Sequence, residues 1–97
     1  MLDLNTIKEK IKNRTSKTVI IDSHDVKIHL WEGKELKKLN SLYQIQEFIS
    51  PYIGIGSKDN ELLAINPIDG KCYLIPLIPL DLEESVLVSE NFDTLPQ

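Results

Sequence analysis

Apolar residues near the start of the chain recur with the period of a helix. Leu4, Ile7 and Ile11 lie three or four positions apart, with lysines between them. This spacing predicts a short amphipathic helix with one apolar face. Asp3 or Asn5 can accept hydrogen bonds from the first free backbone N–H groups, so the helix is expected to begin there.

The pattern then changes to that of two strands joined by a turn. Residues 18–21 are rich in β-branched side chains, and residues 26–30 alternate apolar and polar side chains. Asp22, Ser23 and Asp25 between the two segments favour a turn. The pattern therefore predicts a β-hairpin.

A second helical segment follows the hairpin. Leu36, Leu39, Tyr43 and Phe48 occur at roughly helical intervals, which predicts one helix or a pair of helical turns. Pro51 ends this segment, because the residue before a proline avoids the α region.

From residue 52 the period becomes two, and three strands are predicted in succession. Apolar residues alternate with glycines in 52–57, and apolar residues dominate in 61–66 and 71–78. The connections at 58–60 and 66–70 contain turn-forming residues. Short turns between consecutive strands give an antiparallel meander.

Two prolines and an acidic stretch shape the rest of the chain. Pro76 and Pro79 cannot donate to a strand ladder, so the third strand is expected at a sheet edge or leaves the sheet near Pro76. A short strand is predicted at Val86–Val88, followed by a final helical turn around Phe92 and Leu95.

Together these elements predict a single α+β domain spanning residues 1–97. An antiparallel meander over about residues 52–78 forms its sheet, with an N-terminal hairpin and flanking short helices. The predicted core consists of Ile53, Ile55, Leu62, Ala64, Tyr73, Ile75 and Phe92.

Composition agrees with one independently folding domain. The chain has 97 residues, of which 41% are hydrophobic and 27% charged, as in ordinary globular proteins. No apolar run approaches the roughly 20 residues that span a bilayer, and the start lacks the apolar stretch of a secretory signal. We expect a cytoplasmic protein with no membrane contact. Cys72 is the only cysteine, and we expect it to be a small buried residue.

Charge is distributed unevenly along the chain. Residues 1–38 contain nine Lys and Arg against six Asp and Glu, whereas residues 39–97 contain two against nine. The acidic part argues against nucleic acid as a partner, because phosphate binding requires clustered basic side chains. A basic protein partner is the expectation instead.

The segment GIGSKDN, residues 54–60, resembles a phosphate-binding loop only in its two glycines. A dinucleotide loop needs three spaced glycines before a helix, and Lys58 lacks the surroundings of a P-loop lysine. The residues after Asn60 have the pattern of a strand. The segment is therefore predicted to be a hairpin turn, and no cofactor is expected.

Other candidate chemistry is weak. His24 and His29 do not have metal-ligand spacing, so we interpret both as surface residues and expect no metal site. Ser57, Ser85 and Ser89 lack a recognisable nucleophile arrangement. Trp31 either packs in or at the rim of the core or forms a partly exposed anchor. We therefore expect no catalytic residues and a protein that is not an enzyme.

The stretch from residue 81 to residue 93 contains five carboxylates and no basic side chain. It is either a solvated face that keeps the protein soluble or a docking surface for a cationic partner. The candidate partner-binding residues are Asp81, Glu83, Glu84, Glu90 and Asp93, with Asp59 and Glu61 as secondary candidates.

The order of short motifs from residue 28 to residue 95 resembles the SUKH superfamily. The motifs are an IGS strand, a turn to a glutamate and an apolar strand, a DG hairpin, an aromatic-bearing strand and a final helical turn. The residues that carry them include Gly54, Gly56, Ser57, Glu61, Asp69, Gly70, Tyr73 and Phe92. The polar residues KDN replace the usual glycine triplet, and a short helix and hairpin replace the family's longer N-terminal helical region.

The resemblance implies a non-enzymatic, protein-binding α+β domain. Its bacterial relatives commonly neutralise a toxin, often a nuclease, so an immunity-type protein with a basic toxin domain as partner is the favoured hypothesis. An intracellular scaffold or regulatory binding module of the cell-wall-regulator type is the alternative. An enzyme acting on a small molecule is the third, and a deep pocket with convergent polar groups would favour it.

Overall fold

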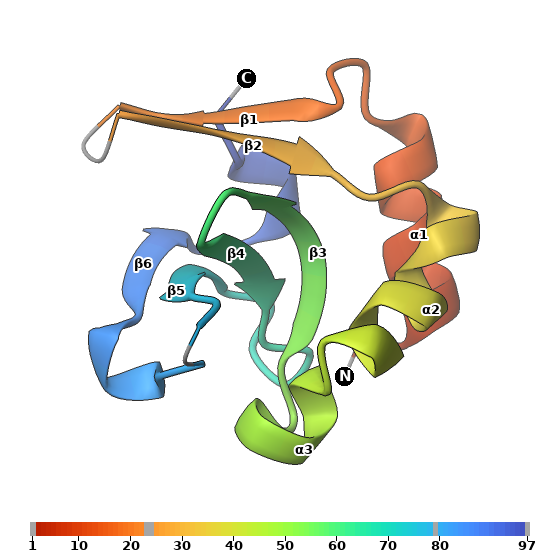
Figure 1. Ribbon diagram of the computed structural model, residues 1–97. Coiled ribbons are helices and arrows are strands. Elements are labelled where there is room, and N and C mark those ends of the chain that lie inside the picture. Colours follow the sequence, from red (N-terminus) through yellow and green to blue (C-terminus); the bar gives the residue numbers. More distant parts are fainter. Residues whose placement is uncertain (1, 23–24, 79, 97) are drawn as a thin grey trace.

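The computed structural model describes residues 2–22, 25–78 and 80–96, and over these residues six strands form one antiparallel sheet (Figure 1). Each strand pairs with its neighbours along the chain, in the order β1-β2-β3-β4-β5-β6. The elements are α1 (Leu4–Asn13), β1 (Thr18–Ile21), β2 (Val26–Leu30), α2 (Gly33–Leu42), α3 (Ile45–Ile49), β3 (Ile53–Lys58), β4 (Glu61–Ile65), β5 (Cys72–Pro76), η2 (Leu82–Glu84), β6 (Val86–Ser89) and η3 (Phe92–Thr94), where η denotes a single 3₁₀ turn.

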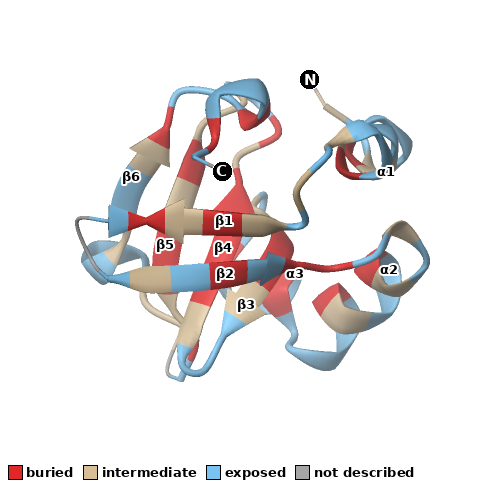
Figure 2. Cartoon of the chain, turned by 90° about the horizontal axis from the view of Figure 1, so that it is seen from above, coloured by how far each residue is buried: buried red, intermediate tan, exposed pale blue. Residues whose placement is uncertain are grey.

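The predicted α+β class is confirmed, and the meander of residues 52–78 is present as β3, β4 and β5. The sheet is larger than predicted, because the β1–β2 hairpin joins it through the pair Leu30 and Gly56, and β6 joins through Leu74 and Val86. Figures 1 and 2 show β1 and β2 lying across the other strands, so the sheet is strongly curled. The hairpin is thus part of the main sheet.

The position of β5 corrects one prediction. β5 lies between β4 and β6, so the expectation of a sheet edge is wrong, whereas the chain does leave the sheet at Pro76. Pro76 pairs with Glu61 of β4, but the pairing of β5 with β6 covers only Cys72 to Leu74. The missing N–H of Pro76 therefore does not interrupt the β6 ladder. Pro79 lies outside the described residues.

Helix α1 forms as its sequence predicts. The Asp3 carboxylate accepts a hydrogen bond of 2.7 Å from the Thr6 backbone N–H, and Ile7 and Ile11 are buried. Accepting this bond also lowers the pKa of Asp3. At the other end, the Lys17 ammonium donates to the carbonyl oxygens of Lys12 at 3.2 Å and of Arg14 at 2.7 Å. Both ends of α1 are thus capped by side chains.

The second helical segment, which the pattern predicts as one helix or a pair of helical turns, forms two helices, α2 and α3. Gln44 has a φ of 55°, in the left-handed region, so the helix cannot continue through it. The break resets the helical phase, and α3 buries Ile45 and Ile49. Phe48, which the pattern assigned to the apolar face, is 63% exposed.

One hydrophobic cluster fills the space between the helices and the curled sheet. All four residues of Leu62–Ile65 in β4 are fully buried, so both faces of the central strand are covered (Figure 2). The buried members of the predicted core are Ile55, Leu62, Ala64, Ile75 and Phe92. Ile53 and Tyr73 are only half-buried, because Ile53 lines a surface hollow and Tyr73 lies beside the exposed Leu87.

The two glycines of β3 allow close packing. A Cβ on Gly54 would lie 2.6 Å from Ile45 Cδ1, and a Cβ on Gly56 would lie 2.7 Å from the His29 carbonyl oxygen. The β3–β4 register also shifts between these two glycines. They therefore allow contact with α3 and β2.

The C-terminal turn η3 packs against the N-terminal part of the chain. Phe92 and Leu95 are buried, which confirms the predicted final turn. The Arg14 guanidinium lies 5.9 Å from the centre of the Phe92 ring and donates to the carbonyl oxygens of Leu95 and Pro96. One arginine thus holds the chain end against the segment between α1 and β1.

Candidate functional site

Three connections of the sheet lie at the same end, because consecutive strands run in opposite directions. They are the β1–β2, β3–β4 and β5–β6 connections, which lie away from α1 (Figure 1). Lys27 and Lys58 are the lysines that share this end. Seven carboxylates occupy it, and we define them as the acidic sheet end: Asp22, Asp25, Asp59, Glu61, Asp81, Glu83 and Glu84.

The β3–β4 connection is the tight hairpin turn predicted for GIGSKDN. Lys58 pairs with Glu61, and Asp59 between them has a φ of 53°. The Asn60 amide accepts from the Ile78 backbone N–H at 3.0 Å and donates to the Ile78 carbonyl at 3.3 Å. This pair of bonds fixes the turn, with Asp59 and Glu61, beside the chain that leaves β5.

The β5–β6 connection presents the other predicted carboxylates of this end. The Asp81 carboxylate accepts from the Glu83 backbone N–H at 3.0 Å, so Asp81 caps the turn η2. Glu83 and Glu84 follow in η2 and are exposed. Asp81 therefore has a structural role, whereas Glu83 and Glu84 are accessible to a partner.

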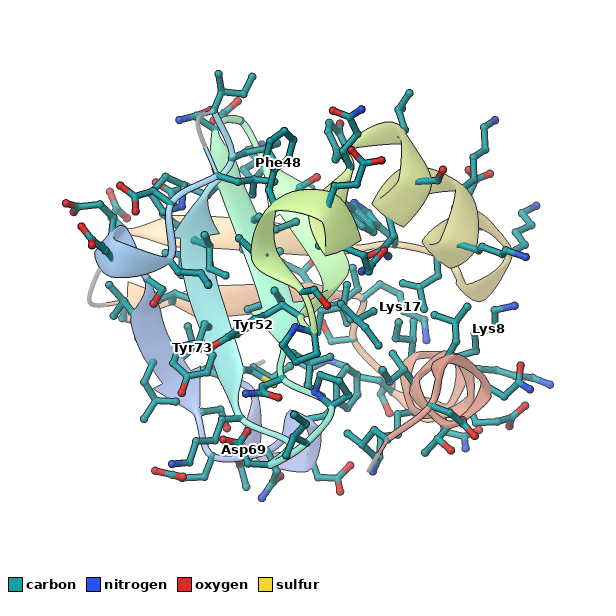
Figure 3. All side chains as sticks on the ribbon, turned by 90° about the horizontal axis from the view of Figure 1, so that it is seen from below. Lys8, Lys17, Phe48, Tyr52, Asp69 and Tyr73 are labelled. Carbon is teal, nitrogen blue, oxygen red and sulfur yellow. The ribbon has the colours of Figure 1, made fainter. Side chains whose placement is uncertain are left out.

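The structure does not bring all five predicted carboxylates together. Glu90 and Asp93 follow β6 and lie at the opposite end of the sheet, where the β4–β5 turn with Asp69 also lies (Figure 3). There the Lys71 ammonium lies 3.9 Å from the Glu90 carboxylate, and Lys10 lies 3.3 Å from Asp93. These two acids are thus partly compensated, unlike Glu83 and Glu84.

Exposed apolar side chains border the acidic sheet end. Ile78 follows β5 and is 76% exposed, and Leu82 stands in η2 directly before Glu83. Val86 and Leu87 come next, at the start of β6, and are 38% and 45% exposed. An apolar centre with a charged rim is the usual composition of a protein-binding surface.

Two surface hollows flank α1 and α2, on the other side of the molecule. One, of about 680 Å³, lies between the start of α1 and the α2–α3 segment, and its lining includes Asn40 and Gln46. The amides of both side chains already bond to backbone groups, so they serve the fold. The other, of about 690 Å³, lies between α1 and the start of α2 and is lined by several lysines, including Lys17, which caps α1.

Trp31 and Cys72 are core residues. Trp31 is buried, stacks on Tyr43 with ring centres 5.9 Å apart and donates from its indole N–H to Ser57 Oγ at 3.1 Å. Cys72 is fully buried, as predicted, and burial raises the pKa of its thiol to about 12. Neither side chain is placed to react with a ligand.

The histidines give no metal site among the residues described. His29 is exposed on β2, as predicted, and His24 lies outside the described residues. Within residues 2–22, 25–78 and 80–96, no three His, Cys, Asp or Glu side chains are grouped closely enough to hold a metal ion.

Tyr52 and Tyr73 form an aromatic pair on one face of the sheet. Their ring centres are 5.5 Å apart in an edge-to-face arrangement, and Figure 3 shows them adjacent. Burial first, and then the neighbouring Tyr73, raises the pKa of Tyr52. Both rings are half-buried, so this pair extends the apolar surface that Leu87 begins on β6.

The sequence reasoning missed Asn40, a buried polar residue that joins α2 to β3. Its amide donates to the carbonyl oxygens of Leu36 at 2.8 Å and Gly54 at 2.9 Å, and it accepts from the Gly54 N–H at 2.8 Å. The Asn40 amide thereby bonds to the backbone of β3 at Gly54, beyond the point where β2 stops pairing with β3. Its position four residues after the buried Leu36 was the signal that could have identified it.

Comparison with known proteins supplies no identity: no protein-family model matches the chain, and neither does any curated protein. Across the described parts of the chain, none of the helices has the length and apolar character needed to cross a membrane. The functional proposal therefore depends on the surface chemistry and on the resemblance to the SUKH superfamily.

Proposed function

We propose that this protein is a non-enzymatic binding domain of the SUKH type whose acidic sheet end captures a basic surface of another protein. The observation that carries the proposal is that three connections at the same end of the sheet contain or adjoin seven carboxylates, with exposed Ile78, Leu82 and Leu87 in or after the β5–β6 connection. The most specific form of the proposal is an immunity-type protein that neutralises a bacterial toxin in the cytoplasm.

Electrostatics supports a basic partner. Carboxylates concentrated at one end of a small protein attract a cationic surface over long range and raise the association rate. The same charges repel nucleic acid, so the acidic sheet end disfavours that class of partner. A basic nuclease toxin combines both requirements, because its own positive surface serves to bind phosphate.

The apolar side chains would supply affinity once the partner has arrived. Burial of apolar surface contributes roughly 25 cal/mol per Å², and Ile78, Leu82, Val86 and Leu87 are available for it. Exposed ion pairs alone contribute little, typically below about 1 kcal/mol each. The proposed interface therefore combines charge for encounter and apolar contact for retention.

The proposal requires that the adjacent gene encode a protein ending in a small toxic domain, and co-expression with that domain tests it. That domain should arrest growth when expressed alone, growth should return when this protein is produced with it, and the two purified proteins should form a stable complex. Arrest that persists at full expression of this protein, with no complex in solution, would overturn the immunity role. Co-purification with a housekeeping protein would instead favour the scaffold alternative.

A further inference from the structure

Strand β6 is an open edge of the sheet. It pairs with β5 on one side only, through Cys72–Ser89, Tyr73–Leu87 and Leu74–Val86. Among the described residues, the backbone groups of Val86 to Val88 that face outward make no further hydrogen bond. An unpaired strand edge is a template on which another extended chain can add.

The side chains of β6 make this edge unusually apolar. Val86 and Leu87 are exposed, and Leu87 lies beside Tyr73, which contacts Tyr52. Leu87, Tyr73 and Tyr52 thus form a strip that runs inward from the edge. Proteins commonly protect an edge with an inward lysine, a proline or a bulge within the strand. The segment VLVS has neither a lysine nor a proline, but the register shift between Cys72–Ser89 and Tyr73–Leu87 leaves Val88 as a bulge, so the regular part of the edge is at Val86 and Leu87.

Acidic residues lie on both sides of this apolar segment, and their charge favours a bound strand with basic ends over one with acidic ends. Glu83 and Glu84 precede β6, and Glu90 follows it. If two copies of the chain paired antiparallel through β6, Glu83 and Glu84 of one would face Glu90 of the other, and like charges would repel. A strand with basic residues at both ends would place opposite charges there instead.

We infer that β6 binds an extended strand of the protein partner, with an apolar centre and Lys or Arg on both sides. The incoming strand pairs with the β6 backbone, and its alternate side chains pack against Leu87 at the outer end of the apolar strip. The basic ends meet Glu83 and Glu84 on one side and Glu90 on the other. This inference rests on the proposed function, because it specifies how the basic partner is held.

The probe is a synthetic peptide of alternating Thr and Val with two lysines at each end. Two matched control peptides replace the lysines by glutamates or the central Val by proline, which cannot complete the ladder. Amide hydrogen exchange of the full chain, followed by NMR, should slow by about tenfold or more at Val86–Val88 with the lysine peptide alone. No slowing at β6, slowing at β1 instead, or equal slowing by the proline peptide would overturn the inference.

A variant at the edge separates strand addition from simple charge attraction. Leu87→Lys places a protective charge on the exposed edge and should abolish the slowing without changing the melting temperature, whereas Glu9→Lys on α1 should retain it. Sedimentation should show a monomer at all concentrations, and a dimer lost in Leu87→Lys would assign the edge to a second copy and overturn the inference.

The two proposals can fail separately. If the neighbouring toxic domain forms no complex but the lysine peptide pairs with β6, the immunity role fails and strand addition stands. If the complex forms while the amides of Val86–Val88 still exchange as fast as in the free protein, strand addition fails and the immunity role stands.

Discussion

Gly56 sets how closely β2 approaches β3. A Cβ at this position would lie 2.7 Å from the His29 carbonyl oxygen and 3.1 Å from Leu30 Cα, and these backbone atoms cannot rotate away. Gly56→Ala should therefore destabilise the fold by about 1–3 kcal/mol in urea unfolding. Gly33→Ala is the matched control, because its Cβ would meet only Lys8 atoms, the nearest at 3.5 Å. Equal stability of the two variants would refute the close-packing role.

Cys72 gives the protein a dependence on alkaline pH. Burial raises the pKa of its thiol from 9.0 to about 12, so above pH 9 the unfolded chain loses this proton while the folded chain keeps it. The contribution of Cys72 is therefore complete below pH 9 and declines as pH rises towards 12, by at most about 1.4 kcal/mol per pH unit. The stability difference between the wild type and Cys72→Ala should be constant below about pH 8.5 and narrow between about pH 9 and pH 10.5 in urea unfolding. A constant difference would show that the thiol titrates normally.

Single residues were predictable where their role is local. Asp3 beside an apolar helical pattern indicated a cap, and a lone small cysteine in a strand indicated burial; the structure has both. Asn40 was not predictable to the same degree, because its partner Gly54 is fourteen residues away and binds it through backbone atoms. Backbone partners have no signature in the sequence.

At the scale of elements, Asn40 joins α2 to β3. Asn40→Ala would leave the buried N–H and C=O of Gly54 without their partner, so the variant should lose about 2–4 kcal/mol in urea unfolding. The exposed Asn13→Ala, at the end of α1, should change stability by less than about 0.5 kcal/mol. A loss below about 1 kcal/mol in Asn40→Ala would mean that water replaces the amide without cost.

The elements themselves were largely predictable from periodicity. Apolar and β-branched patterns identified all six strands; β1 and β2 bury alternate side chains, and β4 lies between two covered faces. A pair of helical turns was one of two predicted alternatives for this segment, but the position of the break was not predictable, since Gln44 adopts a left-handed conformation that sequence patterns reserve for Gly or Asn. The pairing of β5 with β6 was missed, because Pro76 suggested an edge two residues beyond the actual ladder.

At the scale of the whole molecule, the fold groups charges differently from their order in the sequence. Asp22 and Asp25 come from the basic half of the sequence yet lie at the acidic sheet end, whereas Glu90 and Asp93 lie at the other end beside lysines. This regrouping depends on the order of the strands in the full sheet, which the local sequence patterns do not specify. The candidate site was thus only partly predictable.

The association rate of the complex tests the central claim, that the acidic sheet end captures a basic partner. Glu83→Lys with Glu84→Lys should retain the fold and slow association with the neighbouring toxic domain about tenfold at roughly 20 mM salt. The effect should shrink at about 0.5 M salt, where exposed charges are screened over a few ångströms. Glu9→Lys with Glu32→Lys, which changes net charge equally beside α1 and α2, should have little effect. An association rate unchanged by the first pair at low salt, or slowed equally by both pairs, would contradict the account.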